Sequence, residues 1–556
     1  MKKSFVKSMI CLLVICFACE PVTNPDEEKI PEETPEQVPG EEDTPEEETP
    51  EEEPPVNVPE WESADEAVAN MGIGWNLGNT LDALADMTHD GADWRYWETC
   101  WGQSITKPEL MTMMKEAGFN AVRVPVSWGV HLGADGKVYS SWMNRVHEIV
   151  DYVIDAGLYC IVNIHHDTGA DEKAWLIASG EGYQSVRTRY ESLWRQIAEQ
   201  FKEYDHHLVF ESYNEMLDSR RSWCFASFNG GYDAALAEDA YDAINDYAQS
   251  FVDVVRSTGG NNSVRNLIVN TYGACSGAGT WNPHLKDPLI YMDLPEDSVD
   301  GHLIFEVHAY PDIDDLSKTR TEVEGMFEAL NTHLVSKGAP VIIGEWGNSS
   351  ENPTFENKLE FMDYFVTEAS RNGFGTFYWM GLSDGPARSL PAFNQPEEAK
   401  AIAKAYHGDG FTGKFPVIDD YDIRYAVTYT SQWAEANLSN TSVNFSDYTG
   451  IRVRLASAPG EGNLAIKVYG DSEGNEQYSH FSTAEHTVTF KTAALGSHSK
   501  RITLQYMKSG SFTTIVTSAH LIGKDGSETP LWLSPFWGCS VDMDVTNSVS
   551  AVTVVL

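Results

Sequence analysis

The stretch LVFESYNEML, residues 208–217, begins like a buried β-strand and ends in polar groups. Its first three residues are apolar and suit a strand, whereas Asn214 and Glu215 place an amide beside a carboxylate. Taken alone, the segment could equally be a strand that runs out into a polar loop. Similar segments elsewhere in the chain decide between these two interpretations.

Seven further apolar runs alternate with helix-like stretches between residues 64 and 410. One such stretch, ELMTMMKEAGFN (109–120), has the apolar spacing and late glycine of a helix that closes before a strand. Eight doubly buried strands separated by helices predict an α/β fold, the (β/α)8 TIM barrel. An open doubly wound sheet is the alternative, but no glycine-rich phosphate loop follows the first run. The other runs are IGWNLGN (73–79), AVRVPV (121–126), YCIVNIHHD (159–167), LIVNTY (267–272), LIFEVHAY (303–310), PVIIGEWG (340–347) and TFYWMG (376–381).

Polar and aromatic residues gather toward the carboxyl ends of these runs, where a (β/α)8 barrel carries its active site. One polar strand end would mean little, but six of them are expected to converge on one end of the barrel. They carry Arg123 in the second run, His165, His166 and Asp167 in the third, Asn214 and Glu215 in the fourth, His308 and Tyr310 in the sixth, Glu345 and Trp346 in the seventh, and Trp379 in the eighth.

Two carboxylates on the fourth and seventh strands, Glu215 and Glu345, suit glycoside hydrolysis. One carboxyl protonates the leaving oxygen, and the other attacks the anomeric carbon or activates water. Because side chains alternate along a strand, Asn214 and Glu215 can both reach a ligand only if the chain bends or bulges there. Tryptophans near the strand ends could stack on pyranose rings, although several of them could equally be core packing. They are Trp94, Trp97, Trp101, Trp128, Trp175, Trp223, Trp281 and Trp379.

The barrel region resembles family 5 of the glycoside hydrolases, the cellulase and mannanase family of the clan A retaining enzymes. The resemblance is carried by motifs in the expected order over residues 61–410. These are GWNLGN, RVPVSW, NIHHD, YNE, HAY, IIGEWG and FYWMG. It implies that Glu215 is the acid/base and Glu345 the nucleophile. The chain departs from the family in the strand-four motif, where SYNEM replaces the commoner NEP, so the loop shape and the substrate are less defined.

The same resemblance implies roles for the surrounding residues. Asn214 would hydrogen-bond the sugar 2-hydroxyl, and Arg123 and Tyr310 would hold Glu345 ionised and oriented. His165 and His308 would support the site, and Trp379 would form the floor of the subsite where cleavage occurs.

The implied activity is that of a retaining endo-β-1,4-glycanase acting on a glucan backbone such as cellulose, mixed-linkage glucan or xyloglucan. An endo-β-1,4-mannanase is the alternative. A non-catalytic polysaccharide-binding protein would require the loss of Glu215 or Glu345, and both are present.

Three geometric expectations accompany this assignment. The two carboxyl groups should stand about 5–5.5 Å apart. Arg123 should lower the pKa of Glu345, and Glu215 should be protonated in the free enzyme. By resemblance, the peptide bond between Trp379 and Met380 should be cis.

We expect no metal or other cofactor. His165 and His166 are adjacent on a strand, so their side chains should diverge rather than share an ion. The chain contains no H-E-x-x-H motif or metal-ligand cysteine spacing.

The N-terminal 60 residues predict export. Residues 1–19 have the shape of a secretory signal and resemble a lipoprotein signal that would lipidate Cys19. Residues 20–60, rich in Glu and Pro, should form an extended disordered tether. We therefore expect a monomeric, surface-anchored outer-membrane lipoprotein, with periplasmic or secreted placement as alternatives. The net charge of −46 makes nucleic acid an unsuitable partner.

After the catalytic domain (61–410), residues 414–556 alternate apolar and polar residues between turn signals, which predicts an antiparallel β-sandwich. It could be a carbohydrate-binding module with Trp433, Trp532 or Trp537 as a sugar platform, or a stabilising accessory domain. The five cysteines outside the signal are an odd number, and their pairing cannot be deduced. They are Cys100, Cys160, Cys224, Cys275 and Cys539.

Overall fold

The computed structural model describes most of the chain from residue 61 to residue 555. The gaps are 86–87, 224–231, 278–287, 352, 418–422, 440–442, 445–447, 461, 471–475, 483–486, 492–497 and 532–548. The signal, Cys19 and the tether therefore lie outside the described residues, as do Cys224, Trp281, Trp532, Trp537 and Cys539. Among the described cysteines, Cys160 is a buried free thiol.

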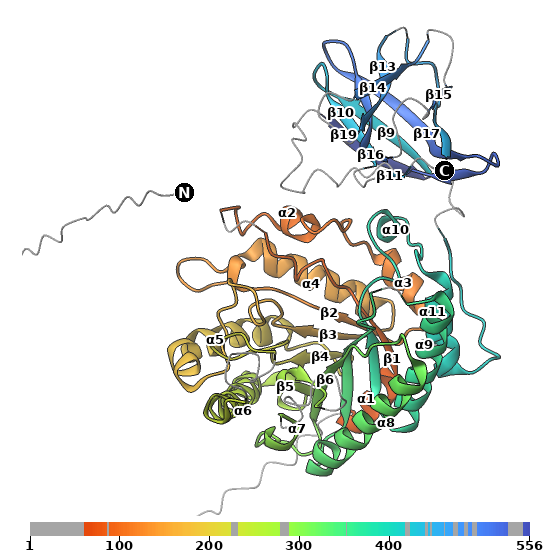
Figure 1. The fold of residues 1–556 in the computed structure, drawn as a ribbon. Helices are drawn as coiled ribbons and strands as arrows, with labels where there is room; N and C mark the ends of the chain where they lie inside the picture. The colour runs from red at the N-terminus through yellow and green to blue at the C-terminus, as the bar shows by residue number, and fades with distance from the viewer. Residues whose placement is uncertain are drawn as a thin grey trace, which may run out of the picture. The chain divides into compact units, whose positions relative to one another are not determined.

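Eight parallel strands close into a barrel in sequence order, which confirms the predicted fold class (Figure 1). All eight are buried along their length, as strands enclosed on both faces must be. They are β1 (Ile73–Asn76), β2 (Ala121–Val124), β3 (Tyr159–Asn163), β4 (Leu208–Glu211), β5 (Leu267–Cys275), β6 (Leu303–Ala309), β7 (Val341–Trp346) and β8 (Gly375–Tyr378).

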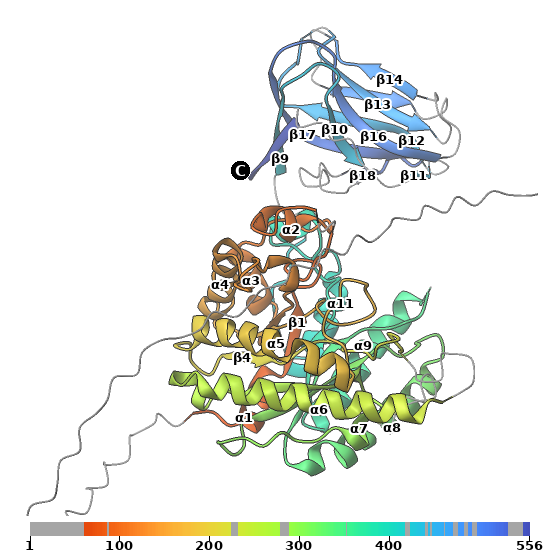
Figure 2. The same cartoon turned by 90° about the vertical axis from the view of Figure 1, so that its left-hand side faces the viewer.

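Helices surround the strands, and Figure 2 shows α5 and α6 side by side on the outside of the barrel. The helix predicted from residue 109 ends at Glu116, and Gly118 then turns the chain at a φ of +99°. The helices are α1 (Ala64–Met71), α2 (Trp94–Thr99), α3 (Pro108–Glu116), α4 (Ser140–Asp155), α5 (Gly180–Phe201), α6 (Ala234–Ser257), α7 (Pro288–Tyr291), α8 (Leu316–His333), α9 (Phe355–Arg371), α10 (Pro386–Ser389) and α11 (Pro396–His407).

Helix α1 closes the amino end of the barrel. Its N-terminus is a capping box formed by Ser63 and Glu66, and its buried face includes Val68 and Met71. These residues share an apolar cluster with strand residues such as Ile161 and Ile304. The amino end is thus sealed by packing, which leaves the carboxyl ends of the strands for the polar residues.

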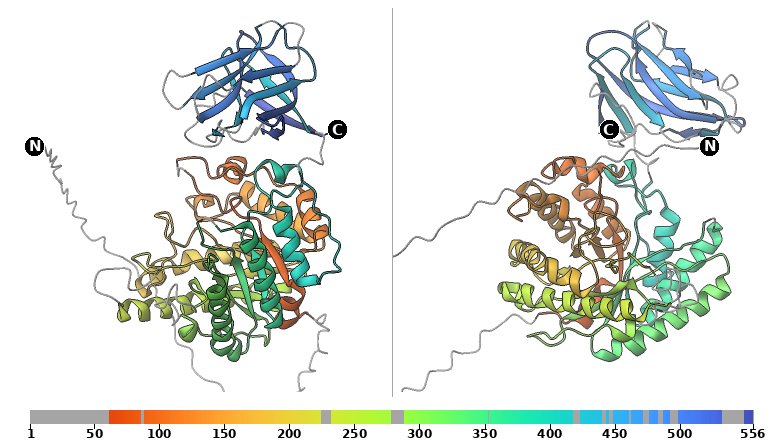
Figure 3. Two further views of the ribbon diagram at one scale, coloured as in Figure 1. Left: turned by 45° about the vertical axis from the view of Figure 1, so that its right-hand side comes forward. Right: turned by 60° about the vertical axis from the view of Figure 1, so that its left-hand side comes forward.

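The C-terminal region forms two antiparallel sheets around a core of its own, which confirms the predicted β domain (Figure 3). One sheet has the order β10-β16-β13-β14 with β11 beside β16, and the other has the order β15-β12-β17-β9-β19 with β18 beside β17. The strands are β9 (Ile423–Tyr429), β10 (Glu435–Ser439), β11 (Val443–Asn444), β12 (Tyr448–Leu455), β13 (Leu464–Gly470), β14 (Glu476–His480), β15 (Thr487–Lys491), β16 (His498–Tyr506), β17 (Phe512–Gly523), β18 (Glu528–Pro530) and β19 (Val549–Val555).

Candidate active site

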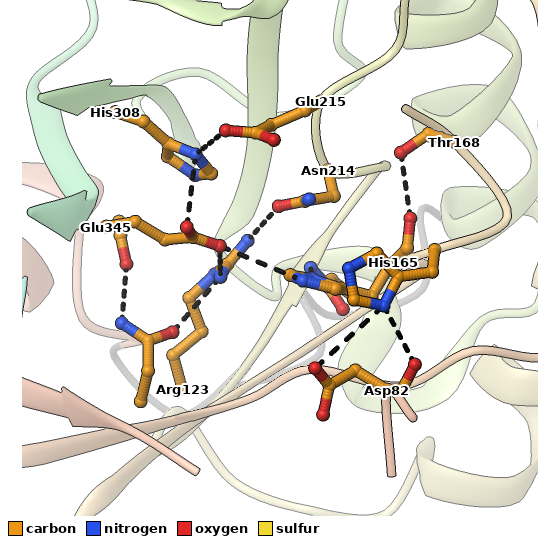
Figure 4. Close-up of polar contacts among 12 residues, drawn as sticks. Asp82, Arg123, His165, Thr168, Asn214, Glu215, His308 and Glu345 are labelled. Carbon is orange, nitrogen blue, oxygen red and sulfur yellow. Dashed lines mark hydrogen bonds and ion pairs between the residues drawn. The ribbon is translucent and has the colours of Figure 1, made fainter. Parts of the chain in front are cut away.

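Two carboxylates and a histidine meet at the carboxyl end of the barrel (Figure 4). Glu345 is on β7 and His308 on β6, whereas Glu215 follows β4. One side-chain oxygen of each glutamate and one ring nitrogen of His308 all lie within 4.8 Å of one another. The sequence therefore identified a real cluster, assembled from strands far apart in the chain.

The chain bends between β4 and Glu215, as the sequence required. Regular pairing of β4 ends at Glu211, and Ser212 N–H donates to the carbonyl of Ile268 on β5 at 2.9 Å. Asn214 N–H turns the other way and donates to the carbonyl of Ile164 at 2.9 Å. Strand alternation no longer applies beyond Glu211, so Asn214 and Glu215 can both face the site.

Two hydrogen-bond donors and one nearby histidine hold the carboxylate of Glu345. Arg123 Nη1 donates to Oε1 at 2.8 Å, and the hydroxyl of Tyr310 donates to Oε2 at 2.7 Å. His308 Nδ1 lies 3.5 Å from the same Oε2. The side chain is nearly fully buried, so its position is set by these contacts rather than by water.

Burial raises the pKa of Glu345, against the opposing charges of His308 and Arg123. Arg123 lowers this pKa, as expected, but burial outweighs its effect and the net shift is upward. The sequence identified Arg123 as the neighbouring cation, but it does not reveal how strongly desolvation of the carboxylate raises the pKa. Arg123 and His308 still act in the expected sense, because each favours the ionised form.

His308 carries a positive charge that serves both carboxylates. Burial opposes that charge, but Glu345, Glu215 and Glu306 outweigh burial and raise the pKa of His308 to about 10. Its Nδ1–H donates to Glu215 Oε1 at 2.8 Å, and Glu215 itself remains partly exposed. The protonation of Glu215 in the free enzyme stays a prediction.

Arg123 also positions Asn214. Its Nη2 donates to Asn214 Oδ1 at 2.8 Å, and its Nη1 donates to Asn76 Oδ1 at 3.1 Å. Because the carbonyl of Asn214 is engaged by Arg123, the amide nitrogen is the donor that Asn214 can offer to a sugar hydroxyl.

Trp379 is half-buried and stacks on His165, with ring centroids 5.7 Å apart and planes 5° apart. A Cβ at Gly78 would lie 2.9 Å from Trp379 Cη2, so glycine is needed there to seat the indole. The pKa of His165 is well below its usual value because of burial and the charges of its neighbours. Its ring is therefore neutral and can pack against the indole.

The peptide bond after Trp379 is not cis, contrary to the expectation, because the described part of the chain contains only trans peptides. The chain turns here through positive φ values instead, +30° at Met380 and +72° at Gly381.

The tryptophans divide into packing and exposed rings. Trp97 and Trp128 are core residues whose indole N–H groups donate to backbone carbonyls. Trp94 and Trp175 are half-buried beneath arginine side chains. Trp101 and Trp223 are 40% and 44% exposed. Among the described tryptophans of this set, Trp101 and Trp223 are exposed enough to meet a ligand, and their exposure distinguishes them from the others.

The divergence expected of His165 and His166 is wrong. Regular β3 ends at Asn163, and the two rings lie with centroids 4.5 Å apart beside Asp82. Protein contacts account for this group, since Asp82 accepts N–H bonds from Asn79 and Thr80 while His166 Nδ1 faces the Asp82 carbonyl at 2.8 Å. The prediction of no metal stays a prediction.

The sequence interpretation missed a layer of polar residues beneath the site. Arg123 forms two bonds of 2.7 Å to Glu211, which also accepts from Asn163 at 2.9 Å. Glu306 lies 3.3 Å from Arg123. A signal was present: Glu211 and Glu306 are carboxylates inside otherwise apolar runs, and Glu306 precedes His308 by one strand period.

Comparison with known proteins identifies relatives of this barrel. The profile of the cellulase family, glycosyl hydrolase family 5, matches residues 85–384. Endoglucanase B of Neocallimastix patriciarum is 34% identical over 360 residues, which are 62% of this chain and 71% of that protein.

Solved structures similar to this chain are also family 5 enzymes. A GH5-4 broad specificity endoglucanase from an uncultured bacterium is 53% identical with a TM-score of 0.61, and the match covers 64% of this chain and 98% of that one. A family 5 enzyme of Prevotella bryantii B14, in complex with a xyloglucan tetradecasaccharide, is 40% identical with a TM-score of 0.57, covering 62% and 99%.

Proposed function

The chain belongs to glycosyl hydrolase family 5, the cellulase family, and on that premise we propose that it cleaves β-1,4-glucan backbones internally by a retaining double displacement. One observation carries the proposal: carboxylate oxygens of Glu215 and Glu345 lie within 4.8 Å of each other. Retaining enzymes hold their carboxyl groups about 5–5.5 Å apart, whereas inverting enzymes leave about 6.5–9.5 Å for a water molecule.

In the first step, an oxygen of Glu345 bonds to the anomeric carbon while the glycosidic bond breaks. Glu215 gives its proton to the departing oxygen, and a glycosyl ester on Glu345 results. In the second step, Glu215 removes a proton from water, which attacks the anomeric carbon and releases Glu345 as a carboxylate. Arg123 and Tyr310 fix the nucleophile, and the amide nitrogen of Asn214 would bind the 2-hydroxyl.

The substrate we propose is a glucan backbone such as cellulose, mixed-linkage glucan or xyloglucan. The relatives' names support endoglucanase activity, and the Prevotella bryantii enzyme was solved with a xyloglucan oligosaccharide. They do not favour a mannanase. A non-catalytic binding protein is not supported, because both carboxylates and their partners are in place.

The deciding experiment is hydrolysis of cellulose, mixed-linkage glucan, xyloglucan and mannan, with the product anomer followed by NMR. We expect release of the β-anomer first from the glucans, with mannan cleaved least. Initial release of the α-anomer would contradict retention, and preference for mannan would contradict the substrate class.

As the pH is lowered, activity should be lost at a higher pH than an ordinary glutamate would cause. Glu345 must be ionised to attack, and burial raises its pKa above the ordinary value of 4.5. Rate is therefore lost as pH decreases through this raised pKa, before an ordinary carboxylate would be protonated. A profile of kcat/KM against pH measures this, and an acid limb at or below 4.5 would contradict it.

We also propose that the protein is a monomeric lipoprotein displayed on the cell surface. A polymer cannot cross a membrane, so the enzyme must reach it outside, and a Glu- and Pro-rich tether would keep the barrel extended from its anchor. Among the described helices, none is long and apolar enough to cross a bilayer. Light scattering after gel filtration would test the monomer, where a stable dimer would contradict it.

Replacing Cys19 by alanine should move the protein from the membrane fraction to the soluble fraction in its native host, because the lipid-bearing thiol is gone. Cys160→Ala, which removes a buried free thiol of the barrel, is the matched control. Membrane fractionation of both variants alike would exclude the anchor. If intact wild-type cells fail to cleave a large polymer, surface display is wrong even with the anchor present.

The C-terminal β domain is proposed to bind glucan. Trp433, just before β10, is 55% exposed, and its carbonyl accepts from Gln505 of the neighbouring β16 at 3.2 Å. An exposed indole on a hydrogen-bonded backbone is suited to stacking on a sugar ring, although a purely stabilising domain would also tolerate it.

Trp433→Ala in the full-length chain should weaken retention on insoluble cellulose by about tenfold, the loss expected for one stacking ring. Activity on a soluble aryl cellobioside should not change. Ile515→Ala, an exposed apolar residue of β17, is the control. Equal retention of all three proteins would assign the domain a stabilising role.

A further inference from the structure

A fourth carboxyl group, Glu306, lies beneath the two proposed catalytic carboxylates and has no role in the steps above. Glu306 and His308 share one face of β6, and both are buried. Glu306 Oε1 is 3.3 Å from His308 Nε2 and 3.3 Å from Arg123 Nε. Its other oxygen has no hydrogen-bond partner among the residues that the structure describes.

The barrel reserves space for this carboxyl group. A Cβ at Gly344 would lie 1.5 Å from Glu306 Oε1, so only glycine fits immediately before Glu345. The carboxyl group therefore occupies the volume of a missing side chain on β7, directly below the proposed nucleophile.

The charges around Glu306 do not balance if every carboxyl group is ionised. Two buried cations, Arg123 and His308, face four carboxyl groups. Arg123 is already committed to both oxygens of Glu211 at 2.7 Å and to Glu345 at 2.8 Å. Leaving buried charge uncompensated is costly, so two of the four carboxyl groups should carry protons.

Glu211 and Glu345 should be the two ionised groups, because Arg123 donates hydrogen bonds of 2.7 and 2.8 Å to them, whereas its Nε lies 3.3 Å from Glu306. Glu215 must carry a proton to act as the acid, which leaves Glu306 as the second neutral group. In agreement, burial and the adjacent charge of Glu211 raise the pKa of Glu306 to about 8, against Arg123 and His308.

We propose that Glu306 is a positioning residue that works as a buried neutral acid: it accepts the Nε2–H of His308 and thereby aims Nδ1–H at Glu215 and Glu345. An ionised Glu306 would compete for the charge of His308 and draw the imidazolium away from the catalytic pair. This inference rests on the proposed function, both for its kinetic consequence and for the assignment of the other proton to Glu215.

The kinetic test uses Glu306→Gln, which keeps an acceptor oxygen for Nε2–H but cannot ionise. An aryl cellobioside with a good leaving group is the substrate, because its first step does not need the proton of Glu215. In the wild type we expect kcat/KM to fall as the pH rises through about 8, where Glu306 ionises. Glu306→Gln should lose that decline and keep activity within about threefold near pH 6.

Glu306→Leu removes the acceptor and should lower kcat by about 10- to 100-fold near pH 6. KM should change little, because the variant disturbs the orientation of His308 and leaves substrate binding intact. Glu398→Gln is the matched control, a buried carboxyl on α11 that contacts Lys358 and Tyr378. It should keep the wild-type pH profile. An unchanged alkaline decline in Glu306→Gln, or its inactivation at every pH, would overturn the proposal.

A second measurement does not depend on turnover or on folding of the Glu306 variants. In Glu215→Gln protein, infrared spectra should still show a protonated carboxyl group near pH 7 that disappears as the pH rises through about 8. Absence of that band near pH 7 would show Glu306 ionised and end the proposal. Failure of wild type to cleave any glucan would instead refute the proposed function and leave this spectral test in force.

Discussion

Glu345→Gln should reduce kcat on a soluble β-glucan by at least about 10⁴-fold, the loss typical of removing a nucleophile. An amide cannot form the glycosyl ester that the double displacement requires. It also places an NH2 group among three donors, because the carboxylate of Glu345 accepts from Arg123 and Tyr310 and lies 3.5 Å from His308.

That local conflict means stability must be measured with activity. We expect the variant to fold, since Arg123 keeps both bonds to Glu211, but to melt at a lower temperature than the wild type. Glu351→Gln, an exposed carboxyl just beyond β7, is the control and should match the wild type in both assays. A folded Glu345→Gln protein with rates within about tenfold of wild type would remove Glu345 from the chemistry.

Glu215→Gln should show a loss that depends on the leaving group. On a polymer, whose leaving oxygen is a poor one, the rate should fall by about 10²- to 10⁴-fold, the usual contribution of a general acid. An aryl cellobioside with a good leaving group should form the glycosyl ester at nearly the normal rate. Its turnover should then slow at the second step, which needs Glu215 as a base.

Burst kinetics separate these two steps: a fast release of the aryl group followed by slow turnover is expected. Glutamine can still accept the 2.8 Å bond from His308 Nδ1, so the geometry of the pair should persist. Equal losses on the polymer and on the aryl glycoside in the first step would contradict the acid role. Such a result would instead indicate that Glu215 holds the substrate.

The sequence by itself determined the eight-stranded barrel and the identity of the candidate pair. Apolar runs of strand length, separated by helical periodicity, leave few other folds. A charged residue at the end of such a run is also a local feature, which is why Glu215 and Glu345 could be singled out. The bend before Glu215 followed from the same alternation rule, and the structure has it after Glu211.

Only the tertiary structure decided properties that depend on neighbours from several strands. The net direction of the pKa shift of Glu345 depends on how completely its carboxylate is removed from water, which outweighs the lowering by Arg123 that the sequence predicted. The convergence of His165 and His166 depended on where the pairing of β3 stops. The roles of Glu211 and Glu306 could be recognised only from the structure, because both contact Arg123, which comes from a third strand. Desolvation and charge balance are sums over surrounding groups, and those groups are assembled only by folding.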